Sequence, residues 1–254
     1  MLSAFADGTL FGERHGNAPL KVLALHGWGR THRDFDRVLG SSSESALAAI
    51  ALDLPGFGAT PGSENAMTSQ DFAHAVSPVL GETSEPIVIV GHSHGGRVAV
   101  SVAALHPERV KALVLVGAPL LTRATSKKPS VHYRTMRFLH RMRLVSDQRF
   151  EALRRRSGSA DYNAAEGVLR DTLVTVINES FEIELSALTC PVVLVWGEND
   201  QDVPVEVALR IQTLLEKREM PNAAVRLEVL PGVGHLVPTS APAALRAAID
   251  SVMS

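Results

Sequence analysis

A serine between two glycines is the feature of this sequence with the clearest chemistry. The motif Gly91-His92-Ser93-His94-Gly95 follows an apolar run at residues 87–90 and precedes a helical pattern at residues 96–105. A serine at such a strand-to-helix junction sits in a strained turn that exposes its hydroxyl, and the flanking glycines remove side chains that would collide. We therefore predict that Ser93 is a nucleophile; a plain glycine-rich turn is the alternative.

A serine hydroxyl is a weak nucleophile, so it requires a general base and an acid that orients that base. Acidic side chains follow a late apolar run, and His235 follows the last one. The carboxyl ends of parallel strands meet at one sheet edge, which would bring these groups to the serine. We predict His235 as the base and Asp200 as the acid. On spacing alone, Glu198 and Asp202 remain alternatives to Asp200.

Acyl transfer also places negative charge on a carbonyl oxygen, which two backbone N–H groups can stabilise. The residue after the nucleophile, His94, offers one such group, and the early loop His26-Gly27-Trp28-Gly29 offers a second. We expect the N–H groups of Trp28 and His94 to form an oxyanion hole. Packing of Trp28 in a pocket wall is the simpler role and is compatible with this one. The side chains of His92 and His94 are expected to point away from the serine.

Short apolar runs alternate with helical patterns along much of the chain. Continuous runs of Val, Ile and Leu are typical of strands buried on both faces. The predicted strands are residues 22–25, 48–52, 87–90, 113–116, 192–196 and 225–230, with an edge hairpin at residues 4–13, and the predicted helices are residues 96–105, 205–219 and 241–253. This order predicts an α/β fold, with a mostly parallel central sheet and helices on both faces.

One interval, residues 119–191, interrupts this alternation. Its pattern is helical throughout, with candidate helices at residues 133–144, 147–156 and 161–180. An all-helical insertion in an α/β sheet is expected to cover the carboxyl ends of the strands, where ligands bind. We therefore expect residues 1–118 and 190–254 to form the core domain and residues 119–189 to form a helical cap.

The predicted cap carries a concentrated positive charge. Eleven Lys and Arg residues lie between positions 123 and 156, opposed only by Asp147 and Glu151. Such a field can steer an anionic substrate or an acidic partner towards a pocket. Arg137, Arg141 and Arg143 are the candidate steering residues. Solvated helix faces are an equally good interpretation of the same pattern.

Composition excludes several classes of protein. The chain has 254 residues, 25 Lys and Arg against 27 Asp and Glu, and one cysteine, so it can form no internal disulfide. The near-zero net charge argues against nucleic-acid binding by the whole surface. No apolar run is long enough to span a membrane, and the N-terminus lacks a signal-peptide pattern. We expect a soluble, cytoplasmic protein that uses neither a metal nor a cofactor.

The motifs taken together resemble those of α/β-hydrolase-fold serine hydrolases of the capped, esterase-like family. In chain order they are Leu25-His26-Gly27-Trp28-Gly29, Asp53-Leu54-Pro55-Gly56-Phe57-Gly58, the motif around Ser93, His106-Pro107-Glu108-Arg109-Val110, Gly197 to Pro204, and Gly234-His235. The resemblance covers about residues 20–118 and 190–253. It implies a small-molecule ester or thioester as substrate. Some relatives with a similar His-Gly-Trp-Gly loop act on acyl groups held by an acidic carrier protein, so it also admits such a partner.

Three functions follow as alternatives. The first is hydrolysis of a carboxylic ester or thioester through an acyl-serine intermediate. The second is C–C bond hydrolysis with the same triad, although relatives of that kind typically have an aromatic residue after the catalytic histidine, where this chain has Leu236-Val237-Pro238. The third is a hydrolase-like binding protein whose turnover is incidental.

Overall fold

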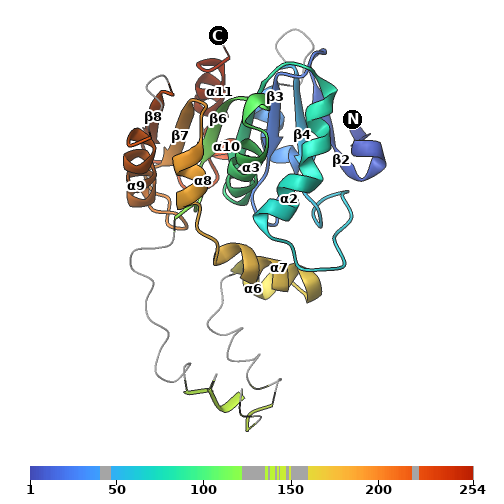
Figure 1. Cartoon of the computed structure of the whole chain (residues 1–254), viewed down its shortest axis with the longest axis vertical. Helices are drawn as coiled ribbons and strands as arrows, with labels where there is room; N and C mark the ends of the chain where they lie inside the picture. The colour runs from blue at the N-terminus through green and yellow to red at the C-terminus, as the bar shows by residue number, and fades with distance from the viewer. Residues whose placement is uncertain are drawn as a thin grey trace.

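One sheet organises the chain. The computed structural model describes residues 1–40, 47–121, 135–136, 138–140, 142, 144–146, 149, 160–218 and 223–253. In this part of the chain, eight strands form a sheet in the order β1-β2-β4-β3-β5-β6-β7-β8 (Figure 1). The strands are β1 (Leu2–Phe5), β2 (Leu10–His15), β3 (Val22–Leu25), β4 (Ala49–Asp53), β5 (Ile87–His92), β6 (Val110–Val116), β7 (Val192–Gly197) and β8 (Val225–Leu230).

The sheet is mostly parallel, as the sequence predicts. From β4 through β3, β5, β6 and β7 to β8, every neighbouring pair is parallel. The two N-terminal strands form the expected antiparallel hairpin, with Leu2 opposite Glu13 and Phe5 opposite Leu10. The hairpin joins the edge of the sheet through an antiparallel pairing of β2 with β4. The α/β-hydrolase topology is therefore confirmed.

Alternate residues of the central strands belong to two different cores. In β3, Leu23 and Leu25 pack in one apolar cluster, whereas Val22 and Ala24 pack in the other. Successive side chains of a strand point to opposite faces, so a strand buried on both sides needs an unbroken apolar run. Each fully buried Val or Leu side chain stabilises the fold by about 1.5–3 kcal/mol.

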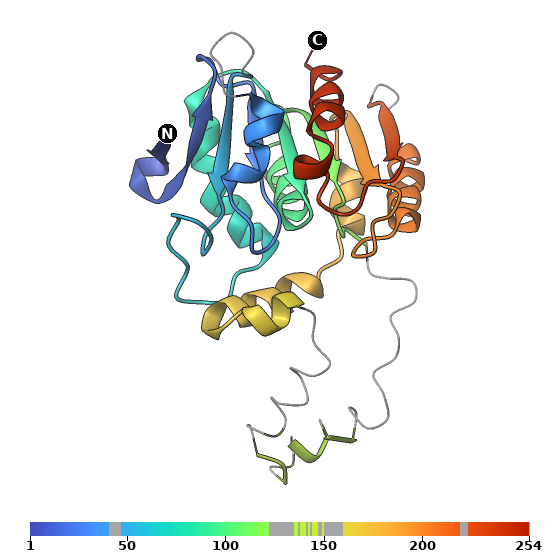
Figure 2. The ribbon, with the colours of Figure 1, turned by 180° about the vertical axis from the view of Figure 1, so that it is seen from behind.

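Helices cover both faces of the sheet. They are α1 (Asp36–Leu39), α2 (Ser69–Val76), α3 (His94–Leu105), α6 (Ala160–Ala164), α7 (Gly167–Ile177), α8 (Glu182–Ala187), α9 (Val205–Glu216), α10 (Val237–Ser240) and α11 (Pro242–Asp250). The core that contains Leu23 and Leu25 includes residues of α2, α3, α8 and α9. The core that contains Val22 and Ala24, on the other face, includes residues of α1, α10 and α11. The views from the two sides show these two helical layers (Figures 1 and 2). None of the helices in the described ranges is long and apolar enough to cross a membrane.

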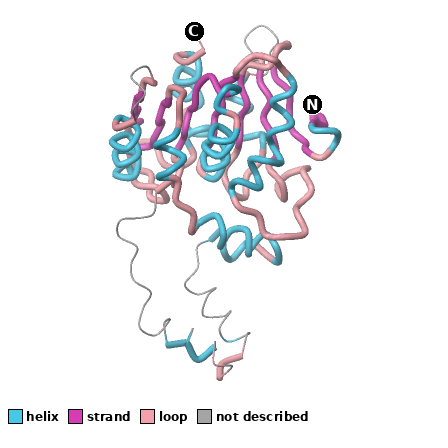
Figure 3. Tube along the Cα trace, in the orientation of Figure 1, coloured by secondary structure: helices cyan, strands magenta, loops and turns pink. Residues whose placement is uncertain are grey.

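The helices predicted for the interval between β6 and β7 are only partly described. Candidate helices at residues 133–144 and 147–156 lie largely outside the described residues. The single helix predicted at residues 161–180 is two helices, α6 and α7, separated near Gly167, whose φ is +50°. Both lie below the carboxyl ends of the strands, whereas α8 packs beside the sheet against α3 and α9 (Figure 3).

Asp53, at the end of β4, organises the loop that follows. Its carboxylate accepts hydrogen bonds from the N–H groups of His32 and Ala59, both at 2.8 Å, and from the His32 ring. Burial alone would raise the pKa of Asp53, but these donors hold it below its usual value. Gly58 has a φ of +56° and lies so close that a Cβ atom there would overlap this carboxylate. The loop from β4 towards α2 therefore depends on a buried acceptor.

We expect Asp53→Asn to lower the free energy of unfolding at pH 7 by about 1–3 kcal/mol, because an amide NH₂ would face a backbone donor. A lowered native pKa contributes stability above pH ~4 that is lost as the pH falls, so the difference between wild type and variant should shrink in acid. Urea unfolding at several pH values measures both effects. Asp7→Asn, on an exposed residue, is the control and should change stability by less than about 0.5 kcal/mol.

Candidate active site

Ser93 occupies a strained turn between β5 and α3. Its φ of 50° and ψ of −113° lie outside the regions that L-residues ordinarily adopt. Its backbone N–H donates to the carbonyl of Val116 at 2.8 Å, and its own carbonyl accepts from Gly96 at 3.0 Å. These bonds tie the turn to β6 and to the first turn of α3, so the surrounding structure maintains the strain.

The glycines around Ser93 permit this turn. A Cβ atom on Gly91 would come within 2.6 Å of the Gly96 Cα atom, and one on Gly95 would come within 2.7 Å of the His26 carbonyl oxygen. The two glycines of the motif are therefore required by close backbone approach, one within the turn and the other towards the loop after β3. The sequence motif and the local structure agree on this point.

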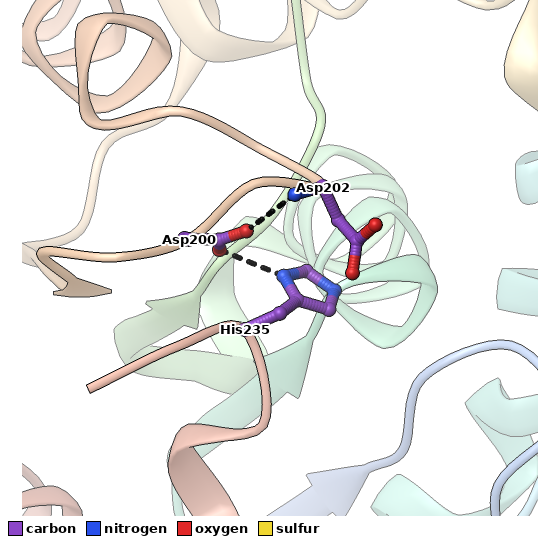
Figure 4. Close-up of side chains that lie close together, drawn as sticks. All are labelled: Asp200, Asp202 and His235. Atoms are coloured by element: carbon purple, nitrogen blue, oxygen red, sulfur yellow. Dashed lines mark hydrogen bonds and ion pairs between the residues drawn. The ribbon is translucent and has the colours of Figure 1, made fainter.

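His235 and Asp200 form a direct hydrogen bond (Figure 4). The Nδ1–H of His235 donates to Oδ2 of Asp200 at 2.7 Å. The other carboxylate oxygen of Asp200 accepts the backbone N–H groups of Asp202 at 3.0 Å and Val203 at 2.8 Å. The Asp200 side chain is fully buried, whereas that of His235 retains 15% exposure. This geometry fixes the tautomer of His235, leaving the Nε2 lone pair available.

The two rival carboxylates have different surroundings. Glu198 accepts the backbone N–H of Gly232 at 2.9 Å and so braces the loop that precedes His235. Asp202 contacts the Asp200 carboxylate through its backbone, and its side chain lies on the other side of the His235 ring (Figure 4). The Asp200 carboxylate thus bonds the His235 ring, whereas the Glu198 carboxylate bonds backbone.

Gly117, directly after β6, lies against the pair. It has a φ of +53°, and a Cβ atom there would lie 3.1 Å from the His235 ring and 3.2 Å from Oδ2 of Asp200. A side chain at this position would press on the hydrogen bond between the two groups. The sequence analysis missed this residue, although a glycine at the end of a predicted strand is a usable signal.

A cavity of about 530 Å³ opens beside these groups. Ser93, His235, Trp28 and His94 all line it. Its other walls are formed by the end of β5 and by residues of the loops and of α3, α6 and α7, namely Gly27, Arg30, His92, Arg97, Pro119, Leu121, Asp161, Leu173, Val176, Ile177, Glu179, Asp202, Val203 and Leu236. The structure thus brings five residues that the sequence singled out, Asp200 included, to one place.

His26 holds the loop that carries Trp28. Its Nε2 accepts the N–H of Leu54 at 2.9 Å, so its Nδ1 carries the proton and donates to the Gly27 carbonyl at 2.7 Å. Burial lowers the pKa of His26 to about 4, and the ring is neutral at physiological pH. The Trp28 ring packs edge to face with the rings of Phe57 and His94, with ring centroids 4.9 and 5.4 Å apart. Trp28 therefore also packs in the cavity wall.

His92 and His94 both line the cavity beside Ser93. The His92 ring lies against His235: the two ring centroids are 4.9 Å apart, and Nε2–H of His92 donates to the His235 carbonyl at 3.0 Å. Burial, with the charge of His235, lowers the pKa of His92 to about 4. Burial, with the charge of Arg97, lowers that of His94 to about 3. Both rings are neutral, so neither is a competing cation beside His235.

One group in the described part of the chain has spacing compatible with a metal ion. Ligand atoms of Asp200, Asp202 and His235 lie within 4.8 Å of one another. Both carboxylate oxygens of Asp200 already accept N–H groups, and Nδ1 of His235 is one of the donors. The group fits an oriented imidazole better than a metal centre, because a metal requires those lone pairs.

The candidate steering residues Arg137, Arg141 and Arg143 lie outside the described residues. Of the eleven basic residues between positions 123 and 156, the structure describes only Arg149. The interpretation of this cluster as a substrate-steering surface therefore stays a prediction.

Comparisons with known proteins agree with the fold and the class. Residues 22–248 match the model of the alpha/beta hydrolase family, and the chain belongs to that family. An esterase from Exiguobacterium antarcticum superposes with a TM-score of 0.71 at 17% identity, covering 100% of this chain and 99% of the esterase. A thermophilic esterase from Thermogutta terrifontis gives 0.69 at 20% identity, with both chains covered completely. A meta-cleavage product hydrolase from Pseudomonas fluorescens IP01 gives 0.68 at 20% identity, covering 99% and 96%.

We expect Gly117→Ala to disrupt the hydrogen bond between His235 and Asp200, because the new methyl group would press on both side chains from a strained backbone. The downfield imidazole N–H resonance in a proton NMR spectrum reports this bond directly, and it should weaken or shift. Gly81→Ala is a matched control, since a Cβ atom there meets nothing within 4 Å. An unchanged resonance in Gly117→Ala would show that a side chain at this position does not disturb the hydrogen bond between His235 and Asp200.

Proposed function

We propose that this member of the alpha/beta hydrolase family is a serine hydrolase that cleaves a carboxylic ester or thioester through an acyl-serine intermediate. The observation that carries the proposal is the 2.7 Å hydrogen bond between His235 and Asp200 in a cavity that Ser93 also lines. In this proposal Ser93 is the nucleophile, His235 is the base and Asp200 is the orienting acid.

The reaction proceeds in two steps. Nε2 of His235 takes the hydroxyl proton of Ser93 while the serine oxygen attacks the carbonyl carbon of the substrate. The imidazolium gives this proton to the leaving alcohol or thiol as the bond to it breaks, which leaves an acyl-serine. Water then repeats the sequence with His235 as base and releases the acid. Asp200 stabilises the imidazolium, since its buried carboxylate faces Nδ1.

The oxyanion of each tetrahedral intermediate is assigned to the backbone N–H groups of Trp28 and His94. His94 is the first residue of α3, so its N–H has no partner within the helix and the helix dipole favours negative charge there. Trp28 lies in the loop that the neutral His26 holds. Loss of one such donor typically costs 10²–10³ in kcat.

Residues 119–189 are proposed as the cap insertion, of which the last helix, α8, packs beside the sheet against α3 and α9 instead of over the cavity. Support comes from α7, which supplies Leu173, Val176 and Ile177 to the cavity wall, and from Asp161 of α6. A cap of this kind excludes water and selects the acyl group.

C–C bond hydrolysis with the same triad is the second candidate. Its support is the similarity in fold to a meta-cleavage product hydrolase. Parallel assays with a vinylogous diketone and an aryl ester separate the two. Faster turnover of the diketone would favour C–C bond hydrolysis over ester hydrolysis. Binding of esters or diketones without turnover of either would favour the third alternative, a hydrolase-like binding protein.

We expect Ser93→Ala and His235→Ala each to lower kcat on an aryl ester by several orders of magnitude, because members of a triad act as a unit. The double variant should be little worse than either single one. Steady-state kinetics check this, and intact-mass detection of a phosphonate adduct on wild type but not on Ser93→Ala identifies the nucleophile. Near-normal turnover in His235→Ala would overturn the assigned base.

Asp200→Asn should cost far more activity than Glu198→Gln or Asp202→Asn, because the Asp200 carboxylate accepts the Nδ1–H of His235 and fixes the tautomer of its ring. A loss on the order of 10⁴ in kcat is the magnitude known for a triad acid. The kcat of the three variants on one ester decides the ranking. Equal losses in all three would remove Asp200 from its assigned role.

A further inference from the structure

Arg97 is a buried cation in the wall of the cavity. It lies on α3, four residues after Ser93, which is about 6 Å further along the helix. Its side chain is 7% exposed, and it lines the same cavity as Ser93 and His235. Burial lowers the pKa of Arg97 to about 10, and the guanidinium therefore stays charged at neutral pH.

One end of this guanidinium is anchored to the protein. Nη1 donates to the carbonyl of Val176 and lies 4.0 Å from the Glu179 carboxylate. Glu179 is itself held by the backbone N–H and the hydroxyl of Ser69, at 2.9 and 2.5 Å. These contacts fix the guanidinium between α3 and the end of α7 and balance its charge.

The other edge of the guanidinium has no hydrogen-bond partner among the described residues. Nε and Nη2 form the side that grips a carboxylate with two parallel bonds. Arg30 uses the same two atoms in this protein to bind Asp34, at 2.8 and 2.7 Å. These two nitrogens of Arg97 are not fully buried, so this edge of the guanidinium keeps contact with open space. Arg97 lines the cavity, and the cavity supplies that space.

Apolar side chains line the cavity alongside Arg97. Leu121, Leu173, Val176 and Ile177 contribute to its wall. Such a wall suits a methylene chain, whereas the guanidinium edge suits a carboxylate or another oxygen acceptor. A plain alkyl chain that filled the cavity would cover these N–H groups without satisfying them, which is unfavourable.

We propose that Arg97 binds a carboxylate at the far end of the acyl group, so that the preferred substrates are half-esters or half-thioesters of dicarboxylic acids. This inference rests on the proposed function, because it names the acyl group that the same cavity accepts. Ser93 attacks the ester carbonyl, and the Nε and Nη2 edge of Arg97 holds the distal carboxylate. Arg97 belongs to α3 and not to the basic cluster at residues 123–156, so this proposal is separate from the substrate-steering prediction.

The test compares monoethyl adipate, which carries the distal carboxylate, with ethyl hexanoate, which has a similar chain without it. We expect the ratio of kcat/KM for the anionic ester to that for the neutral ester to fall roughly ten- to a hundredfold in Arg97→Gln. Arg97→Lys keeps the charge but loses the two-pronged geometry, so it should recover only part of the ratio. An unchanged ratio in Arg97→Gln would overturn the proposal.

Two controls separate the anchor from other effects. Arg30→Gln removes a second cation from the cavity wall whose carboxylate-binding edge is already filled by Asp34, and it should leave the ratio unchanged within about twofold. An equal loss in Arg30→Gln would mean that general positive charge, and not the Arg97 edge, selects the anion. Arg97→Gln could fold poorly because the Glu179 carboxylate loses its neighbouring cation. In that case the double variant Arg97→Gln/Glu179→Gln removes both charges, and the same ratio of kcat/KM values is measured on it.

A binding measurement distinguishes failure of this inference from failure of the proposed function. Calorimetry on Ser93→Ala should show monoethyl adipate binding that weakens roughly tenfold or more when Arg97→Gln is added. If Ser93→Ala still turns over esters, the proposed function fails while the binding comparison still tests Arg97. If Ser93→Ala is inactive and both proteins bind the half-ester equally, only the Arg97 inference fails.

Discussion

The strained backbone of Ser93 is the constraint on which the rest of the site depends. A non-glycine residue at a φ of 50° and a ψ of −113° costs on the order of 1–3 kcal/mol, and it persists only where neighbouring structure over-determines it. Here a parallel sheet buried on both faces supplies that rigidity, and the Ser93 N–H is bonded across to Val116 on the adjacent strand. The turn, the start of α3 and the loop after β3 must then approach one another closely, and Gly91 and Gly95 allow it.

Burial divides the histidines of the site into two kinds. His26 and His92 are neutral, and their rings hold backbone groups, through both nitrogens in His26 and through Nε2 in His92, so they position the cavity without adding charge. His235 differs because its ring is partly exposed to the cavity and faces a buried carboxylate. The Asp200 carboxylate accepts the Nδ1–H of His235, so a side chain orients this ring and its Nε2 is left for chemistry.

Much of this arrangement could be predicted from the sequence, because it depends on local rules. Apolar runs ended by glycine located the strands of the sheet, and the order of Ser93, Asp200 and His235 along the chain placed all three at one edge. The distinction between Asp200 and its neighbours depends on which carboxylate the loop turns towards His235, and spacing alone does not determine that. The break between α6 and α7 was missed because it depends on a left-handed Gly167. Arg97 was missed because its surroundings are formed by residues about 80 positions away.

The position of Arg97 bears on how substrate preference arises in this fold. The motifs around Ser93, Asp200 and His235 sit on the rigid core, whereas most apolar residues of the cavity wall come from the interval between β6 and β7. Arg97 belongs to the core, on the helix that begins at the residue after Ser93, yet its anchoring contacts are with α7 and Glu179. The backbone of α3 fixes where the Arg97 side chain starts relative to Ser93, about 6 Å along the helix. The contacts with the interval then fix where its guanidinium points. The core and the interval therefore together set the distance between the reacting carbonyl and a distal carboxylate, and the interval shapes most of the apolar wall between them.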